Sequence, residues 1–390
     1  MTLRIMTIYG TRPEAIKVAP IIKAIEAEPD LESITVVTGQ HREMLDQVNT
    51  MFGIEPDHDL DIMSAGQTLN GIVAKVVSGV DGILEQEKPD AVIVQGDTST
   101  VMGAAVASFN RQIPVIHLEA GLRSGDINSP FPEEANRKLT SQITTLHLAP
   151  TSTSRANLVH EAISENDIVV TGNSVIDTLL FATRTLEVTF DDDRLEALKN
   201  ARSAGEAGKV LLVTAHRREN LGSAMEDIGG AVADLARKYP ELTVVFPIHK
   251  NPKVREAIRP AVEGLDNVVL LEPLSYAQFT RALSLADIVL TDSGGVQEEA
   301  PSLGKPVLVM RENTERPEAV VAGTVKLIGT HRRRLVDEVS LLLDSEEAYG
   351  AMANAVNPYG DGRAAERTIA AIRWKFSGGP RPKDFGGHTQ

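Results

Sequence analysis

Residues 3–27 read LRIMTIYGTRPEAIKVAPIIKAIEA. Leu3–Tyr9 is a short, continuous apolar run that predicts a buried parallel strand, and residues 14–27 have the apolar spacing of a helix. Between them lies the polar turn Gly10-Thr11-Arg12-Pro13-Glu14, with Pro13 placed for the first helical turn. A buried strand followed by a helix is the repeating unit of a parallel sheet that is covered on both faces.

The same unit recurs along the chain. In the first half, further buried strands are expected at residues 34–38, 91–95, 115–118 and 146–149. Helices are expected between them, near residues 41–51, 68–87, 98–109, 133–144 and 152–163. After a polar stretch at 191–208, a second series of strands is expected at 210–214, 242–247, 268–271, 288–291 and 307–310. Its helices are expected near 223–238, 252–263, 276–285, 294–303 and 331–344. The alternation predicts an α/β protein with doubly wound parallel sheets.

The length predicts two domains. A chain of 390 residues is too long for one ordinary core and suits two α/β domains. We expect an N-terminal domain at 1–175 and a C-terminal domain at 190–360. The helix at about 361–376, which holds Trp374, is expected to pack back on the first domain. The tail 377–390 is rich in Gly and Pro, and we expect it to be disordered.

The composition narrows the class of partner and the compartment. The formal net charge of −15 argues against nucleic acid or an anionic membrane surface as the main partner. To bind an anionic ligand, such an acidic chain must gather positive charge locally. The absence of cysteine excludes disulfides, thiolate metal sites and cysteine nucleophiles. No apolar run approaches the roughly 20 residues of a membrane span and no signal-like leader is seen, so we expect a cytoplasmic enzyme.

Polar residues follow nearly every predicted strand. Ligands of doubly wound sheets bind beyond the carboxyl ends of the strands, which is where these residues fall. The segments are 10–17, 38–42, 96–98 and 119–123 in the first half, and 215–220, 249–251, 292–299 and 311–316 in the second. Scattered surface charge would not gather at one edge, so we expect a binding site there.

Two helix starts suit a diphosphate. Asp292-Ser293-Gly294-Gly295 follows a strand, its glycines allow close approach of a ligand, and free N–H groups at the helix start suit phosphate oxygens. A tight turn capped by Ser293 explains the same residues equally well. Glu299, further along, suits either the hydroxyls of a ribose or a solvated helix face. Arg12 and Lys17 could reach a diphosphate from one side, although a capped helix start also explains them.

The segment His216-Arg217-Arg218-Glu219 is more distinctive. A histidine and two arginines at the exit of a buried strand suit an anionic ligand better than a surface salt-bridge cluster. Taken alone, His41 and His249 are better explained as structural histidines.

Three carboxylates indicate acid–base chemistry. Asp97, Glu119 and Glu133 fall after successive strands of the first half or in the loop that follows, and Asp126 in that loop fits a turn residue better. Carboxylates that converge on one site suit proton transfer. They could also bind a divalent metal, but these carboxylates form no D-x-D pattern and the chain has no H-x-x-x-H pattern, so we expect no metal.

Together these motifs resemble the non-hydrolysing UDP-N-acetylglucosamine 2-epimerases of bacterial type. The resemblance spans residues 3–375 and rests on 10–17, 38–44, 96–98, 119–123, 132–137, 171–173, 215–220, 291–316 and 357–362. It implies a GT-B fold of two Rossmann-like domains facing a central cleft, a homodimer, and an isomerase that uses neither nicotinamide nor metal. The implied substrates are UDP-GlcNAc and UDP-ManNAc.

The resemblance also implies roles for particular residues. UDP would be held by Arg12, Lys17, His216, Ser293, Gly294, Gly295, Glu299 and Arg316, with Phe279 beside the uracil. Asp97, Glu119 and Glu133 would be the acid–base groups, with Arg137 nearby and His216 as a further catalytic candidate. An activating second UDP-GlcNAc would be compatible with Gln40, His41 and Gln67. Glu43 and Gly66 stand where some activated members have Gln and Arg, which leaves the activation open.

The chemistry of the substrate favours elimination. Because C2 of UDP-GlcNAc carries no carbonyl, direct deprotonation faces a large barrier, whereas loss of UDP from C1 gives 2-acetamidoglucal. Re-addition of UDP with proton delivery to the other face then yields UDP-ManNAc. The alternatives are a GT-B glycosyltransferase, a hydrolysing UDP-GlcNAc 2-epimerase and, from another class, a non-catalytic sugar-nucleotide binding protein.

Overall fold

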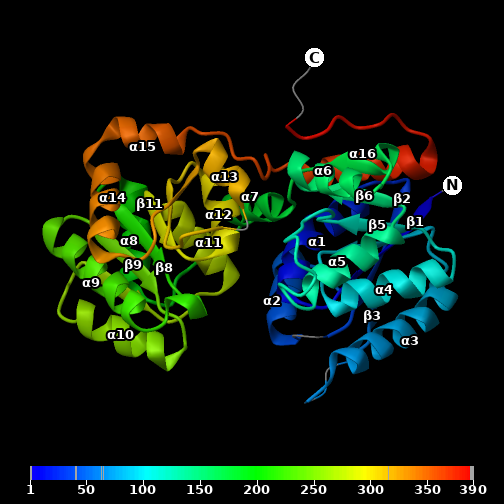
Figure 1. Cartoon of the computed structure of the whole chain (residues 1–390), viewed down its shortest axis with the longest axis horizontal. Coiled ribbons are helices and arrows are strands. Elements are labelled where there is room, and N and C mark those ends of the chain that lie inside the picture. Colours follow the sequence, from blue (N-terminus) through cyan, green and yellow to red (C-terminus); the bar gives the residue numbers. More distant parts are fainter. Residues whose placement is uncertain (1, 40–41, 63, 65, 315, 387–390) are drawn as a thin grey trace. The chain divides into compact units, whose positions relative to one another are not determined.

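The computed structural model describes residues 2–386 apart from 40–41, 63, 65 and 315. It forms two compact units (Figure 1). The first unit comprises residues 1–178 and 359–390, and the second comprises residues 179–358. Each unit is built on one parallel sheet with helices packed against it.

The first unit contains a sheet with the strand order β3-β2-β1-β4-β5-β6-β7, in which every pairing is parallel. Its strands are β1 (Leu3–Tyr9), β2 (Leu31–Val37), β3 (His58–Asp59), β4 (Ala91–Gln95), β5 (Val115–Leu118), β6 (Leu146–Ala149) and β7 (Ile168–Val170). Its helices are α1 (Arg12–Glu26), α2 (Arg42–Phe52), α3 (Leu69–Glu87), α4 (Ser99–Asn110), α5 (Glu133–Gln142), α6 (Ser152–His160) and α16 (Ala364–Ser377). Helix α7 (Val175–Thr185) begins in this unit and ends in the second.

The core of the first unit explains why its strands are apolar throughout. Met6 and Ile8 of β1 and Val92 of β4 are fully buried and belong to one cluster with side chains of α3 and α4, including Val76 and Ala104. Helix α1 packs against α2 and α16, so the sheet is covered by helices from distant parts of the sequence. Burial of this kind removes the polar alternation of a half-exposed strand.

The second unit repeats this architecture. Its sheet has the order β10-β9-β8-β11-β12-β13, again wholly parallel. Its strands are β8 (Val210–Thr214), β9 (Thr243–Pro247), β10 (Val268–Leu271), β11 (Ile288–Thr291), β12 (Val307–Val309) and β13 (Val325–Leu327). Its helices are α8 (Asp193–Ala204), α9 (Ser223–Lys238), α10 (Pro252–Val262), α11 (Tyr276–Leu285), α12 (Gly294–Glu299), α13 (Pro317–Ala322), α14 (Arg332–Asp344) and α15 (Glu346–Ala353).

Both sheets therefore share the Rossmann order, in which the chain first runs to one edge and then returns to continue on the other side of the first strand. The direction changes between β1 and β4 in the first sheet and between β8 and β11 in the second. This switch point is where doubly wound sheets leave room for a ligand beyond the strand ends. The predicted fold class, α/β with two Rossmann-like sheets of the GT-B type, is confirmed.

Every strand expected from the sequence is present, and the strands that were missed are short. Strands β3, β7 and β13 have only two or three residues each. The stretch at 191–208, expected to be a polar connection, instead contains α8. Asp192 caps that helix, and Gly205 ends it with a positive φ of 74°. Its apolar contacts are few, with Leu195 and Leu198 as its buried residues, which explains why periodicity did not reveal it.

The C-terminal tail also differs from the expectation of disorder. Residues 378–386 run beside β7, where the Phe385 backbone N–H donates to the Val170 carbonyl at 2.8 Å. The Asp384 carboxylate accepts from the Val170 backbone N–H at 2.8 Å, and Arg381 donates to the Ile168 carbonyl at 3.0 Å. These contacts satisfy the exposed edge of β7, which a Gly- and Pro-rich composition cannot reveal.

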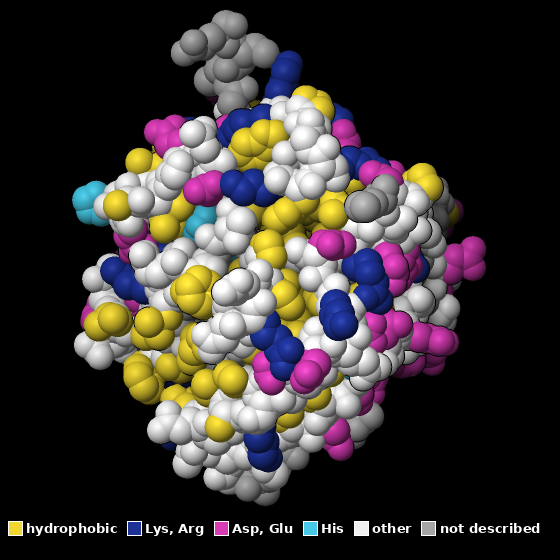
Figure 2. Space-filling view, turned by 90° about the vertical axis from the view of Figure 1, so that its right-hand side faces the viewer, with side chains coloured by type: hydrophobic (Ala, Val, Ile, Leu, Met, Phe, Trp, Pro, Cys, Tyr) yellow, Lys and Arg dark blue, Asp and Glu magenta, His cyan; other side chains and the backbone are white. Residues whose placement is uncertain are grey.

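The surface mixes charges of both signs. On the face shown in Figure 2, acidic and basic side chains lie next to each other with hydrophobic side chains between them. The acidic excess of the chain is therefore not gathered in one field on that face. Among the residues that the structure describes, no helix is long and apolar enough to cross a membrane.

Candidate functional site

Glu119 lies directly after β5, and three side chains from different elements contact its carboxylate. Lys17 of α1 forms an ion pair with Oε1, and Gln95, the last residue of β4, donates to Oε2. Asn173, in the loop after β7, donates to Oε1 at 3.2 Å. Glu119 has a positive φ of 63°, a conformation that side chains other than glycine rarely adopt. The predicted acid–base residue is thus held from both sides in a strained turn.

Asp97 follows β4 and forms an ion pair with Arg137 of α5 at 2.5 Å. Arg137 also contacts the buried Glu134 at 3.1 Å, and Asn136 donates to the Asp97 carbonyl at 2.8 Å. Burial lowers the pKa of Arg137, but the attraction of Asp97 and Glu134 outweighs it and raises that pKa above its usual value. The Asp97 carboxylate is therefore matched with a permanent cation.

Glu133 begins α5 and is half-buried. Within the described part of the chain, its carboxylate makes no hydrogen bond or ion pair, in contrast to Asp97 and Glu119. Asp126, in the preceding loop, accepts from the Asn128 backbone N–H at 2.9 Å, as expected of a turn residue. Of these carboxylates, Glu133 is the least constrained.

Arg12 and Lys17 lie one and a half turns apart at the start of α1. The helix begins with a capping box, in which the Thr11 hydroxyl and the Glu14 carboxylate satisfy each other's backbone N–H groups. Burial raises the pKa of Glu14, against hydrogen bonds from Thr98, Gly10 and Thr11. The capped helix start that was one explanation of this segment is therefore present. The capping box does not use the half-buried Arg12 guanidinium, which lies at the exit of β1.

His216 follows β8 and is oriented by Asp292, which follows the neighbouring strand β11. The His216 Nδ1 contacts an Asp292 oxygen at 2.8 Å, and the backbone N–H groups of His216 and Arg217 donate to the same carboxylate. Burial acts to raise the pKa of Asp292, but the contacts with His216 and Arg217 bring it below its usual value. Asn220 also donates to this carboxylate at 3.1 Å. With Nδ1 occupied by Asp292, Nε2 is the nitrogen of the exposed His216 ring that remains to contact a ligand.

The turn after β11 brings glycine and arginine together. Ser293 precedes α12 and its hydroxyl makes no capping hydrogen bond to the helix. A Cβ at Gly294 would lie 2.8 Å from the end of the Arg316 side chain, so Arg316 lies directly against this glycine and would have to shift to accept a larger residue. Arg316 is held by Glu298 at 2.6 Å, and Gly295 is exposed. The hydroxyl of Ser293 and the guanidinium of Arg316 thus lie beside the backbone of Gly294 and Gly295, which is suited to binding an anion.

Glu299 and Phe279 lie on neighbouring elements of the second unit. Glu299 is buried, and its carboxylate accepts from the Tyr276 hydroxyl at 3.1 Å, so it is no solvated helix residue. Tyr276 and the half-buried Phe279 share α11. Helix α11 therefore carries two aromatic residues, Tyr276 and Phe279, and contacts through Tyr276 the carboxylate that is expected to bind a ribose.

Several residues of this site had no individual role in the sequence analysis. They are Gln95, Glu134, Asn173 and Asp292. Each is a polar residue at a strand exit or in the first turn of a helix, which is a usable signal. The partners of Gln95, Asn173 and Asp292, however, are 24 to 76 residues away, so the sequence does not show whom they contact. Only Glu134 has its partner, Arg137, in the next turn of the same helix.

Known proteins are similar to this chain in both sequence and structure. The sequence profile of UDP-N-acetylglucosamine 2-epimerases matches residues 23–373. A UDP-N-acetylglucosamine 2-epimerase of Yersinia pestis is 50% identical over 371 residues, which are 95% of this chain and 98% of that protein. The chain belongs to the UDP-N-acetylglucosamine 2-epimerase family.

A structure from Listeria monocytogenes matches this epimerase-family fold with a TM-score of 0.92 and 44% identity, over 99% of this chain and 100% of that one. A Neisseria meningitidis UDP-GlcNAc 2-epimerase bound to UDP-GlcNAc matches with a TM-score of 0.82 and 45% identity, over 95% and 99%.

For this epimerase-family chain, the residues suggested for an activating ligand are only partly described. Gln40 and His41 lie outside the described residues. Gln67 donates to the Ile62 carbonyl at 2.6 Å. The described residues contain no group of three or more His, Cys, Asp or Glu that could hold a metal ion.

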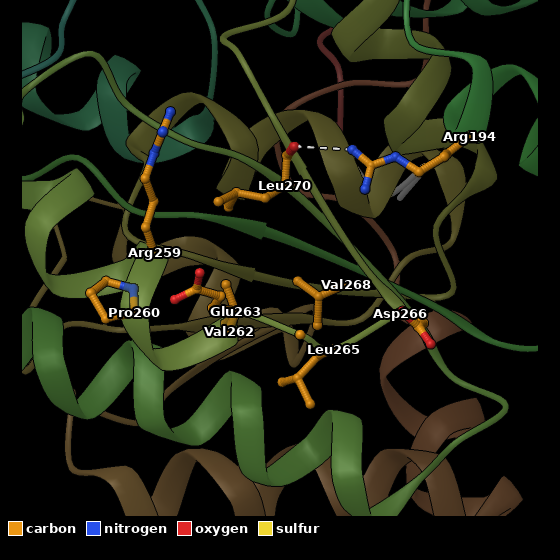
Figure 3. A pocket seen from close by; sticks show the side chains of 10 residues that line it. Arg194, Arg259, Pro260, Val262, Glu263, Leu265, Asp266, Val268 and Leu270 are labelled. Carbon is orange, nitrogen blue, oxygen red and sulfur yellow. Dashed lines mark hydrogen bonds between the residues drawn. The ribbon is translucent and has the colours of Figure 1, made fainter.

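A pocket of about 510 Å³ lies elsewhere in the second unit, at the end of α10 and along β10 (Figure 3). Arg194 donates to the Leu270 carbonyl on one side of it, and Arg259 and Glu263 lie on the other. None of the candidate site residues of the epimerase family lines this pocket. It therefore plays no part in the site described above.

Proposed function

We propose that the chain catalyses the reversible epimerisation at C2 of UDP-GlcNAc to UDP-ManNAc, without hydrolysis and without NAD or a metal. The observation that carries the proposal is the pairing at the exits of two adjacent strands. Asp97 with Arg137 follows β4, and Glu119 with Lys17 follows β5. Membership of the epimerase family supplies the substrate class.

The proposed chemistry is an elimination followed by an addition. A carboxylate removes the proton from C2 while the bond between C1 and the UDP oxygen breaks, and the electron pair of the C–H bond forms the C1–C2 double bond. The products of this step are 2-acetamidoglucal and UDP. UDP then adds back to C1 while an acid delivers a proton to the opposite face of C2. General acid–base catalysis of this kind contributes about 10²–10⁴-fold to a rate.

The three carboxylates differ in whether a cation contacts them. Because Asp97 and Glu119 are matched with cations, we assign them the negative charge that removes a proton or orients the sugar. Glu133, which has no such partner among the described residues, is the third acid–base candidate. We propose that all three carboxylates take part in the two proton transfers.

The second unit is proposed to hold UDP. The Nε2 of His216, the guanidinium of Arg316 and the backbone at Gly294 and Gly295 suit diphosphate oxygens. Glu299 suits the ribose hydroxyls, and Phe279 suits the uracil ring. The positive groups would stabilise the charge that builds on UDP as it leaves C1.

The test is to incubate the purified chain with UDP-GlcNAc alone in deuterated buffer and to follow the products by NMR. UDP-ManNAc with deuterium at C2 is the expected product, because the abstracted proton exchanges with solvent. Product with the original hydrogen at C2, or activity that requires added NAD, would contradict elimination. Free ManNAc with UDP would indicate the hydrolysing reaction, and no product without an acceptor would indicate a glycosyltransferase. Light scattering of the same sample would test the homodimer that the family resemblance implies.

A further inference from the structure

We propose that Gln95 is a positioning residue for the reaction, which holds the Glu119 carboxylate in the one orientation that can serve the substrate. The inference rests on the proposed function, in which Glu119 takes part in acid–base chemistry. Gln95 takes no part in proton transfer itself, because its amide neither gains nor loses a proton at ordinary pH. Its importance comes from where the fold places it.

The burial of Gln95 distinguishes it from Lys17, the charged contact of Glu119. Gln95 is 2% exposed, whereas the Lys17 side chain is 19% exposed and the Glu119 side chain is 9% exposed. A side chain enclosed to this extent cannot reach out to a ligand. Its amide donor is directed at Glu119 Oε2 instead, which is an internal contact between two adjacent strand exits.

The two carboxylate oxygens are held by different donors. Lys17 and Asn173 both contact Oε1, whereas Gln95 contacts Oε2. A carboxylate held at one oxygen can still rotate about its last side-chain bond, and contacts at both oxygens stop that rotation. Gln95 therefore sets the plane of the carboxylate, which decides where its lone pairs point.

The backbone of Glu119 makes this second contact more necessary. With a φ of 63°, Glu119 turns sharply out of β5, so the regular backbone of a strand does not restrict its rotamer. Gly96, with a φ of 82°, turns the chain after Gln95 in the same way. Two residues after Gln95, Asp97 pairs with Arg137. The exit of β4 thus positions both carboxylates of the proposed pair.

The test compares Gln95→Met with a matched control. Methionine has a similar length but no amide donor, so Gln95→Met removes the Gln95 hydrogen bond to Oε2 without adding charge. The control is Thr7→Val in the neighbouring strand β1, because Thr7 is fully buried and its hydroxyl has no hydrogen-bond partner among the described residues. Steady-state kinetics with UDP-GlcNAc, calorimetry with UDP and thermal unfolding are measured for both.

Gln95→Met should lower kcat by roughly 10–100-fold, the cost of a small misplacement of a reacting group, with KM and the Kd for UDP unchanged. Thr7→Val should keep the kcat of the unmodified chain. In a Glu119→Gln background, Gln95→Met should cause no further loss, because its effect passes through Glu119. A kcat for Gln95→Met close to that of Thr7→Val, or an equal further loss in the Glu119→Gln background, would overturn the proposal.

A crystal structure of Gln95→Met gives a readout that does not depend on activity. The Glu119 carboxylate should rotate or occupy more than one conformer in the variant. A single, unchanged orientation would overturn the positioning role. If the unmodified chain fails to epimerise UDP-GlcNAc, the proposed function fails, and the orientation of Glu119 still decides the proposal about Gln95.

Discussion

At the scale of single residues, three of the candidate groups are each restricted by a charged partner. Asp97 is paired with Arg137, Glu119 with Lys17, and His216 with Asp292 at 2.8 Å. Charge-assisted hydrogen bonds of this kind fix geometry as well as charge. Catalytic groups need such fixed geometry, since the reacting atoms must already be aligned when the substrate binds. Because these pairings fix the geometry of Asp97, Glu119 and His216, the role of each residue can be tested by substitution.

Replacing Asp97 by Asn keeps the shape of the side chain and removes its negative charge. We expect kcat to fall by about 10²–10⁴-fold, the usual contribution of a general acid or base. Asp126→Asn is the matched control, because this exposed carboxylate serves only as an acceptor in a turn, a role that an amide oxygen can keep. Steady-state kinetics with UDP-GlcNAc would distinguish them, and equal losses in the two variants would remove Asp97 from the mechanism.

Replacing Glu299 by Ala should weaken the binding of UDP. Loss of a charged hydrogen-bond acceptor costs about 1.5–3 kcal/mol, which calorimetry with UDP measures directly. Tyr276→Phe is the control, since it removes a donor to the Glu299 carboxylate and keeps the carboxylate itself. The control should lose less affinity than Glu299→Ala. Unchanged UDP affinity in Glu299→Ala would reject the ribose-binding assignment.

At the scale of elements, the edge of the first sheet is completed by the C-terminal segment. Strand β7 has three residues, and its backbone groups are satisfied by Arg381, Asp384 and Phe385. The same strand leads into the loop that carries Asn173, which contacts Glu119. Phe385 lies beside that loop, close to Gly172. A segment far from the site in sequence therefore supports the element that borders it.

Asp384→Ala should destabilise the first unit. The buried Val170 backbone N–H would lose its acceptor, which costs about 1–3 kcal/mol when no water replaces it. The exposed Lys383 makes no contact within the described part of the chain, so Lys383→Ala is the control and should leave stability unchanged. Unfolding can be followed by the fluorescence of Trp374, the sole tryptophan, which lies on α16 of the same unit. Equal unfolding curves for the two variants would mean that the tail contributes nothing to β7.

At the scale of the whole molecule, the stability of the first unit should depend on two buried histidines. His117 of β5 and His147 of β6 are direct neighbours in the sheet. Burial lowers the pKa of His117 to about 4 and that of His147 to about 3. In the unfolded chain, each would bind a proton at about pH 6.5. Folding therefore excludes protons that the unfolded chain takes up.

The sign of the pH dependence follows from this difference. Between pH 6.5 and about pH 4 the unfolded chain binds more protons, so the stability that is present above pH 6.5 is lost as the pH falls. The loss is ~1.4 kcal/mol per pH unit for each histidine at most. His147→Phe should reduce the slope, as measured by Trp374 fluorescence during chemical unfolding at several pH values. A variant with the slope of the unmodified chain would show that His147 does not titrate in this way.

By itself, the sequence determined the two parallel sheets and the edge at which polar residues gather. Buried strands must be apolar throughout, and parallel strands end at a common edge, so both features can be read from local patterns. Only the tertiary structure decided the partners, because Lys17 and Glu119 are 102 residues apart and Asp97 and Arg137 are 40 apart. It also decided that Gln95 faces Glu119 and that the tail covers β7. Such contacts depend on strand order and packing, which bring together residues whose own neighbours in the sequence give no sign of each other.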